Sequence, residues 1–316
     1  MAPIKRLLLA TDLSREARSA ELWACAMAAS WNAHLMAMTV LEFPDGVDPD
    51  QAVNQDHLVE RTREASDKLM NLKQFASGKQ LDVEIRVATG LPCDLVRLVA
   101  EVEKVDMIIV GAKGKHGLSH GGLGSTTGAI IRTAPCPVLV APKQGNEQVK
   151  SQVLDRMLIP IDFSDCSLDA LEYAVTIARQ SHASIELLHI VDPACEGIDD
   201  AADVRSRQIA IKNLTKRLEE VSAGLLAGGI YSTIRVEMGI PSDAIINRAS
   251  EASHSLIVMG VHGRRGQTCS VAGSVTQSVL RRASCPVLVV RTPKFGLEHN
   301  RRATDQTSRE ASGASR

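Results

Sequence analysis

The chain has 316 residues, 44% of them hydrophobic, with a formal net charge of −1 and only 3% aromatic residues. This apolar content supports globular domains rather than a disordered chain, and the neutral charge with so few aromatic residues argues against a nucleic-acid surface. No apolar run approaches the roughly 18 residues needed to span a bilayer, so we expect a cytoplasmic protein. The seven cysteines are scattered and none forms a CxxC pair, which argues against a disulfide framework or a zinc site.

Short apolar runs alternate with segments of helical periodicity along the whole chain. The first half predicts strands at about 5–10, 34–41, 82–88, 106–111 and 137–141, and the second half at about 156–161, 184–191, 232–238, 255–260 and 286–291. Helical periodicity is seen between the first-half strands, for example over 17–29 and 91–102. Strands that alternate with helices predict a parallel sheet with crossover helices. Continuous apolar runs such as 107–110 indicate strands buried on both faces, as in a doubly wound α/β fold.

Three segments depart from this alternation. Residues 43–50 are rich in Pro, Gly and Asp and predict a loop, which leads into a charged helical stretch over 58–75. Residues 144–151 are polar and predict the boundary between the two halves. We therefore expect a first domain over 1–146, a second over 153–292 and a disordered polar tail over 293–316.

The two halves repeat one glycine pattern at the same place. Gly111-Ala-Lys-Gly114, nine residues and Gly124-Ser125 recur 149 positions later as Gly260-Val-His-Gly263, nine residues and Gly273-Ser274. Each pattern follows the fourth predicted strand and ends where a helix is expected to begin. A helix start offers unpaired N–H groups and a positive dipole end, so the pattern predicts a polyphosphate site in each half.

An aspartate follows the first predicted strand of each half, at Asp12 and Asp162. In an open parallel sheet, ligands bind outside the carboxyl ends of the strands where the strand order reverses, so each aspartate is expected to share a cleft with a glycine pattern. A carboxylate beside a phosphate would be repelled, which favours hydrogen bonds to ribose hydroxyls. Helix capping is the competing interpretation, because Asp is a favoured N-cap residue. Ser14 and Ser164 could cap instead.

The glycine spacing, the aspartate after the first strand and a closing Cys-Pro-Val-Leu-Val strand in each half resemble the ATP-binding branch of the universal stress protein family. The resemblance covers 1–292 and implies two tandem Rossmann-like domains, similar to adenine nucleotide alpha hydrolases. Each would be a five-stranded parallel sheet of order 3-2-1-4-5 with helices on both faces. It also implies that the fifth strands, which pair between subunits in family dimers, can pair within this chain.

The resemblance further implies which residues would hold ATP. The aspartates would meet the ribose, and Val40 and Ile190 would line the adenine pockets. The phosphates would be held in the first half by Gly111, Gly114, Lys115, Gly124, Ser125 and Thr126, and in the second by Gly260, Gly263, Arg264, Gly273, Ser274 and Val275. Mg²⁺ would arrive with the phosphates, and no metal site of the protein's own is expected. Arg264 in the second half stands where the first half has Lys115, and the nine-residue segments between the glycines also differ. These differences put equal ATP affinity of the two sites in doubt.

The function that this resemblance implies is an ATP-binding cytoplasmic regulator of the stress response, in which nucleotide occupancy changes the conformation or the binding of a regulatory protein partner. A homodimer is compatible with this function. A slow ATPase or nucleotidyl-transfer enzyme stays an alternative, although the chain has no G-x-x-x-x-G-K-[ST] motif and no catalytic residue is assigned. A nucleotide-free scaffold or chaperone-like protein is a third interpretation. The glycine fingerprint of a dinucleotide dehydrogenase is absent after the first strand.

Overall fold

The structure is a computed structural model that describes residues 2–42, 52–78, 80–114, 122–143, 154–192, 204–263 and 272–291. Ten strands are described, and each lies within one residue of its predicted ends. The strands are β1 (Arg6–Ala10), β2 (His34–Leu41), β3 (Val83–Thr89), β4 (Met107–Gly111) and β5 (Val138–Ala141) in the first half, then β6 (Arg156–Pro160), β7 (Ser184–Val191), β8 (Ser232–Met238), β9 (Leu256–Gly260) and β10 (Val287–Val290) in the second.

Eight helices connect the described strands. They are α1 (Arg18–Trp31), α2 (Ala52–Ser77), α3 (Pro92–Val102), α4 (Ser125–Thr133), α5 (Asp165–Ser181), α6 (Val204–Ala227), α7 (Pro241–Glu251) and α8 (Ser274–Arg282). The predicted helices over 17–29 and 91–102 are confirmed as α1 and α3, and the charged stretch over 58–75 lies within the longer helix α2. None of the described helices is long and apolar enough to cross a membrane.

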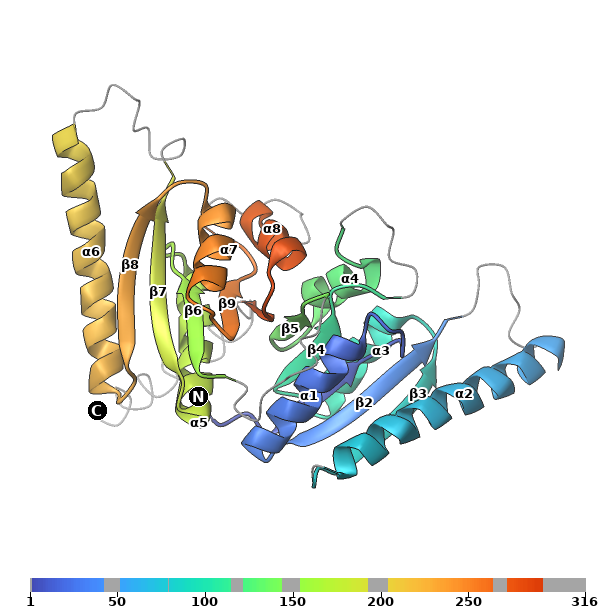
Figure 1. The fold of residues 1–316 in the computed structure, drawn as a ribbon. Helices are drawn as coiled ribbons and strands as arrows, with labels where there is room; N and C mark the ends of the chain where they lie inside the picture. Colours follow the sequence, from blue (N-terminus) through green and yellow to red (C-terminus); the bar gives the residue numbers. More distant parts are fainter. Residues whose placement is uncertain are drawn as a thin grey trace, which may run out of the picture.

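The strands form one sheet in the order β3-β2-β1-β4-β5-β10-β9-β6-β7-β8. Each half therefore has the predicted order 3-2-1-4-5, with parallel pairing inside the half. The halves meet where β5 and β10 pair antiparallel, with Leu139 opposite Leu288. Figure 1 shows the two halves side by side, with β5 on the side of the first half that faces the second. Because the β5–β10 pair is antiparallel, the strands of the two halves run in opposite directions, and their carboxyl ends point to opposite sides of the molecule.

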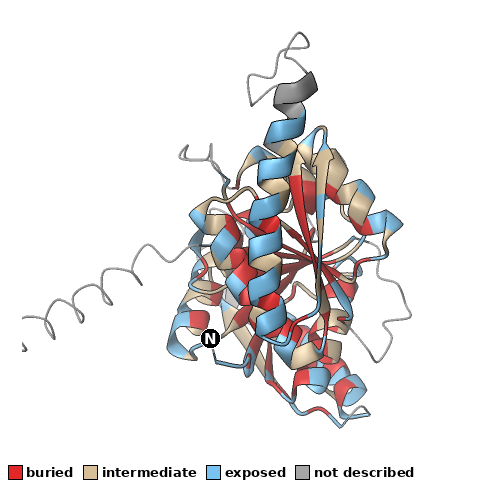
Figure 2. Cartoon of the chain, turned by 90° about the vertical axis from the view of Figure 1, so that its left-hand side faces the viewer, coloured by how far each residue is buried: buried red, intermediate tan, exposed pale blue. Residues whose placement is uncertain are grey.

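Helices cover both faces of the sheet, and alternate strand residues serve the two faces. Leu7 and Leu9 of β1 pack in a core beneath α1, α2, α5 and α6, whereas Leu8 packs in a second core beneath α3, α4, α7 and α8. Side chains of successive strand residues point to opposite faces, so the continuous apolar runs seen in the sequence follow from burial on both sides. In Figure 2 the central strands are buried and the outward faces of the helices are exposed.

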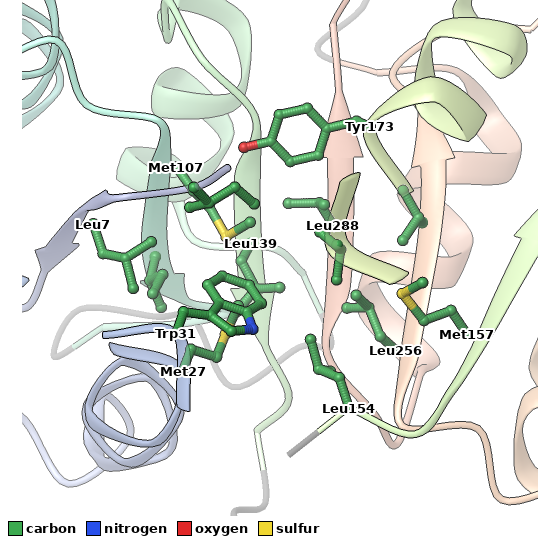
Figure 3. Close-up of a cluster of buried hydrophobic side chains, with 14 of the residues drawn as sticks. Leu7, Met27, Trp31, Met107, Leu139, Leu154, Met157, Tyr173, Leu256 and Leu288 are labelled. Atoms are coloured by element: carbon green, nitrogen blue, oxygen red, sulfur yellow. The ribbon is translucent and has the colours of Figure 1, made fainter. Parts of the chain in front are cut away.

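The two halves share the core beneath α1 and α5. Figure 3 shows Trp31, Leu7 and Leu139 of the first half beside Leu154 and Leu288 of the second, and all of them are buried. Hydrogen bonds cross the same junction: the Trp31 indole N–H donates to Ser181 Oγ at 2.8 Å, and the Tyr173 hydroxyl donates to the Asp106 carbonyl at 2.6 Å. The junction therefore combines a continuous sheet with a shared hydrophobic core.

Several sequence predictions fall outside the described residues. These are the loop over 43–50, the domain boundary over 144–151 and the tail over 293–316, together with Lys115 and Arg264 beside the glycine turns.

Candidate functional site

A cleft of about 900 Å³ opens in the first half at the carboxyl ends of β1, β2 and β4. From β1 the chain adds β2 and β3 on one side, and it then returns to add β4 on the other side of β1. The cleft lies at this reversal of strand order, where open α/β sheets bind ligands. Seven of the predicted site residues line this cleft: Asp12, Val40, Gly111, Gly114, Gly124, Ser125 and Thr126. The structure thus brings together the described first-half residues that the sequence grouped, although their part in binding stays a prediction.

The first glycine turn lies directly against the aspartate. A Cβ atom added at Gly114 would stand 2.5 Å from Asp12 Oδ2, a distance too short for any side chain. The second half repeats this arrangement, with a Cβ at Gly263 placed 2.5 Å from Asp162 Oδ2. A side chain at either position would displace the carboxylate, so glycine lets the carboxylate stay this close to the turn, and the spacing seen in the sequence reflects a contact between two separate segments.

The glycine turn is joined to the start of α4 by hydrogen bonds. The Gly124 N–H donates to the Ala112 carbonyl at 2.9 Å, and the Thr127 hydroxyl donates to the Gly111 carbonyl at 2.8 Å. As a result, the N-terminus of α4, with its unpaired N–H groups and positive dipole end, is held at the cleft.

The second half forms the same hydrogen bonds. The Gly273 N–H donates to the Val261 carbonyl at 2.8 Å, and the Thr276 hydroxyl donates to the Gly260 carbonyl at 3.0 Å. Ser274 and Val275 begin α8 as predicted, with Gly273 as its N-cap. Neither threonine was predicted as part of the turn. In each half a threonine stands two positions after the Gly-Ser pair, and this repetition in the sequence could have indicated it.

The aspartates do not cap the helices that follow them. Asp12 Oδ1 accepts a hydrogen bond from the Ser14 N–H at 3.1 Å, and Asp162 Oδ1 accepts one from the Ser164 N–H at 2.9 Å. Ser164 is the N-cap of α5, where its hydroxyl oxygen accepts from the Ser167 N–H at 3.3 Å. One oxygen of each carboxylate thus orders its own loop, and the other faces the glycine turn, an arrangement that favours the ligand-binding interpretation over capping.

Helix α2 contributes a wall of the cleft that the sequence analysis did not assign. Arg61, Glu64 and Lys68 of α2 line the cleft, as does Lys113 of the glycine turn. Among the described lining residues, which do not include Lys115, three side chains are basic and three, including Asp12 and Glu42, are acidic. The N–H groups at the helix start and glycine turn are therefore important donors for a polyphosphate beside these balanced charges.

The second glycine turn is packed more tightly than the first. A Cβ at Gly260 would lie 2.7 Å from the Cys166 carbonyl oxygen at the start of α5, whereas the nearest atom at Gly111 is the Lys113 carbonyl oxygen at 3.2 Å. Ile190, near the end of β7, is partly buried at the place that Val40 has in β2. The two halves therefore share a backbone arrangement but differ in how closely their elements approach.

Comparison with known proteins identifies the repeated unit. The family model described as the Universal stress protein family matches residues 3–142 and 154–291. A universal stress protein from Methanocaldococcus jannaschii is 32% identical over 148 residues, which cover 44% of this chain and 83% of that protein. One from Mycolicibacterium smegmatis is 26% identical over 300 residues, which cover 90% of this chain and 96% of that protein.

A solved structure has the same two-unit fold. The crystal structure of a universal stress protein from Archaeoglobus fulgidus superposes with a TM-score of 0.68 at 22% identity, and the match covers 90% of this chain and 97% of that one. At this identity the likeness establishes the fold alone.

Proposed function

Because the chain belongs to the universal stress protein family, we propose that it binds ATP in the first-half cleft and acts as a cytoplasmic regulator of the stress response. One observation carries the proposal: Asp12 contacts the glycine turn in a cleft that also contains the N-terminus of α4. This arrangement puts a carboxylate and a set of phosphate-binding N–H groups within reach of one ligand. A nucleotide has both ribose hydroxyls and phosphates to match them.

The size and lining of the cleft fit this ligand. Its volume of about 900 Å³ falls in the range of roughly 300–1,000 Å³ typical of small-molecule sites. In the proposed complex, the N–H groups at Ser125 and Thr126 hold the phosphates, Asp12 accepts hydrogen bonds from the ribose and Val40 contacts the adenine. Mg²⁺ enters with the phosphates.

Regulation requires that ATP bind two states of the protein with different affinity, because a ligand shifts an equilibrium only by that difference. In this proposal a protein partner distinguishes the two states.

The test is a Gly124→Glu, Gly273→Glu double variant. The fold can accept it, because a Cβ at Gly124 has its nearest neighbours at 3.5 Å and one at Gly273 at 3.6 Å, both ordinary contacts. The added carboxylates would then compete with phosphate at the helix starts. Calorimetric titration with ATP·Mg²⁺ should show binding to the nucleotide-stripped wild type and none to the double variant.

The matched control is the Gly124→Ala, Gly273→Ala variant, which adds the same Cβ atoms without charge and should keep most of the affinity. Thermal melting checks that both variants are folded. A folded Glu double variant with an unchanged dissociation constant would refute the site assignment, and a wild type that binds no ATP at millimolar concentration would favour the nucleotide-free scaffold.

A further inference from the structure

A chain of hydrogen bonds leads from a buried carboxylate to the loop that carries Asp12. Glu21 of α1 and Thr11, which follows β1, are each 6% exposed. The Thr11 hydroxyl donates to Glu21 Oε1 at 3.2 Å, and the Leu13 N–H donates to Thr11 Oγ1 at 3.0 Å. The two residues that flank Asp12 are thus tied to each other and to α1.

The chemistry of these groups fixes the direction of each hydrogen bond. A carboxylate only accepts hydrogen bonds, so the single hydroxyl proton of Thr11 points to Glu21. The lone pairs of the Thr11 oxygen are then left to accept from the Leu13 N–H. Glu21 therefore holds the Thr11 hydroxyl in the orientation that the Leu13 N–H needs.

Leu13 has a backbone conformation that requires support from its surroundings. Its φ is 58°, in the left-handed region that residues other than glycine rarely adopt and that costs free energy unless other contacts hold it. Leu13 directly follows Asp12, so its conformation sets the course of the loop on which Asp12 lies beside Gly114. The hydrogen bond from Leu13 to Thr11 therefore bears on the position of the Asp12 carboxylate.

Glu21 also connects the Asp12 loop to helix α2. The Arg18 guanidinium donates to Glu21 Oε2 at 2.9 Å, and its central carbon lies 5.1 Å from the centroid of the Phe75 ring in α2. A guanidinium over an aromatic face makes a favourable cation–π contact. Because α2 forms a wall of the cleft, one carboxylate links two sides of the proposed ATP site.

The second half builds the same region from apolar side chains. One residue before the site aspartate, and six and nine residues after it, the first half has Thr11, Arg18 and Glu21, and the second half has Ile161, Leu168 and Leu171. The fold therefore does not require polar residues at these places. Apolar residues in place of a buried charged group are often neutral or stabilising, so the polar set of the first half indicates a local role rather than a contribution to overall stability.

The second-half loop reaches the same conformation with different support. Phe163, which follows Asp162, has a φ of 60°, and the Ser164 hydroxyl donates to Asp162 Oδ1 at 2.5 Å. The second-half aspartate is thus supported by a serine of its own loop, whereas the first-half loop is also tied to α1 through Thr11.

We propose that Thr11 and Glu21 are positioning residues of the first-half site, which hold the Asp12 loop against the Gly114 turn and so set the affinity for the ribose of ATP. This inference rests on the proposed function. Glu21 is not among the described residues that line the cleft, so it acts on the ligand through its neighbours and not by contact.

The first test removes the acceptor of the Leu13 N–H. In full-length protein carrying Gly273→Glu, calorimetric titration with ATP·Mg²⁺ measures the first-half site. Thr11→Val keeps the shape of the side chain and removes its hydroxyl, so the dissociation constant should rise about threefold to tenfold, the worth of one hydrogen bond. Thr11→Ser is the matched control, because it retains the hydroxyl and should keep a dissociation constant close to that of the background.

A double variant separates positioning from stability. Thr11→Ile with Glu21→Leu introduces the second-half pair, which is well buried there, with Ile161 2% and Leu171 8% exposed. The double variant should therefore melt close to the temperature of the background and still bind ATP about as weakly as Thr11→Val.

A second nucleotide tests whether the effect passes through Asp12. Dideoxy-ATP lacks both ribose hydroxyls, so the background should bind it more weakly than ATP, and Asp12→Ala should remove most of this difference. Thr11→Val should reduce the same difference, and it should add little to Asp12→Ala when the two are combined, as expected for residues that act as one unit.

The outcomes separate this inference from the proposed function. An unchanged ATP dissociation constant in Thr11→Val, or equal losses for ATP and dideoxy-ATP, would overturn the positioning role and leave ATP binding standing. Absence of ATP binding to the wild type would instead overturn both.

Discussion

The first and second halves have the same strand order and the same glycine turns but different side chains around those turns. Their strands share one order, and a Cβ atom added at Gly114 or Gly263 would stand 2.5 Å from the carboxylate of the neighbouring aspartate. Yet the first half has an open cleft lined by Leu13, whereas the second has Phe163 stacked with two other side chains. The comparison teaches that a repeated glycine motif fixes the backbone at the strand ends, whereas the side chains around it differ between the halves.

A second difference lies at the opposite end of the strands. Glu186, which is 4% exposed, is paired with Arg248, His254 and Arg156 in the second half. The first half has Met36, Val99, Val105 and Arg6 at the equivalent positions. Although burial acts to raise it, the hydrogen bonds and charge of Arg248 hold the pKa of Glu186 below its usual value. One half therefore encloses an ionic network where the other encloses mainly apolar side chains.

The largest effect is expected from breaking this network. Glu186→Met should destabilise the protein by roughly 2–4 kcal/mol, because Arg248, whose side chain is 19% exposed, loses the carboxylate that neutralises it. The double variant Glu186→Met, Arg248→Val introduces both first-half residues and should recover most of that loss. Urea denaturation measures both values, and a double variant no more stable than the single one would show that the network is not a replaceable unit.

A smaller effect should distinguish the two glycine turns. Gly260→Ala forces a Cβ to within 2.8 Å of the Cys166 backbone and should cost roughly 1–3 kcal/mol through overpacking. Gly111→Ala, whose Cβ would meet its nearest atom at 3.2 Å, should cost less. Thermal melting of the two variants tests the order, and equal losses would contradict the tighter packing of the second turn.

The smallest effect concerns acid stability. Burial lowers the pKa of His254, and the nearby Arg156 and Arg248 also lower it, while Glu186 acts to raise it. An unfolded histidine titrates near pH 6.5, so below about that pH the unfolded chain binds a proton that the folded protein does not. Stability should therefore fall as the pH drops from about 7 to 5.5. His254→Val, the first-half residue, should flatten this fall in urea midpoints, and an unchanged pH profile would contradict the assignment.

The fold could be predicted from the sequence because both of its signals are local. Apolar runs such as 107–110 mark strands buried on two faces, and the glycine repeat marks the strand-to-helix turns. The polar start of α2, over 52–57, lacks apolar periodicity and was not predicted, because such a segment carries no pattern to detect.

The sequence predicted the loops and helix start that form the candidate site, but not the side chains of α2 that line it. Asp12 and Gly114 could be grouped because each lies within three residues of the carboxyl end of a strand, and β1 and β4 are parallel neighbours. Lys68 lies on a long helix whose register on the sheet depends on tertiary packing, so no local pattern could indicate that it lines the cleft. The contact of Arg217 with Phe163 joins residues 54 positions apart for the same reason.

The central claim is that the first-half cleft holds ATP, and nucleotide release from purified protein tests it most directly. The wild type and the two single Gly→Glu variants are purified without added nucleotide and denatured, and the released small molecules are identified by mass spectrometry. We predict ATP from the wild type and from Gly273→Glu, in which the first-half site is intact. Release from Gly124→Glu with none from Gly273→Glu would contradict the account, as would a wild type that releases no ATP.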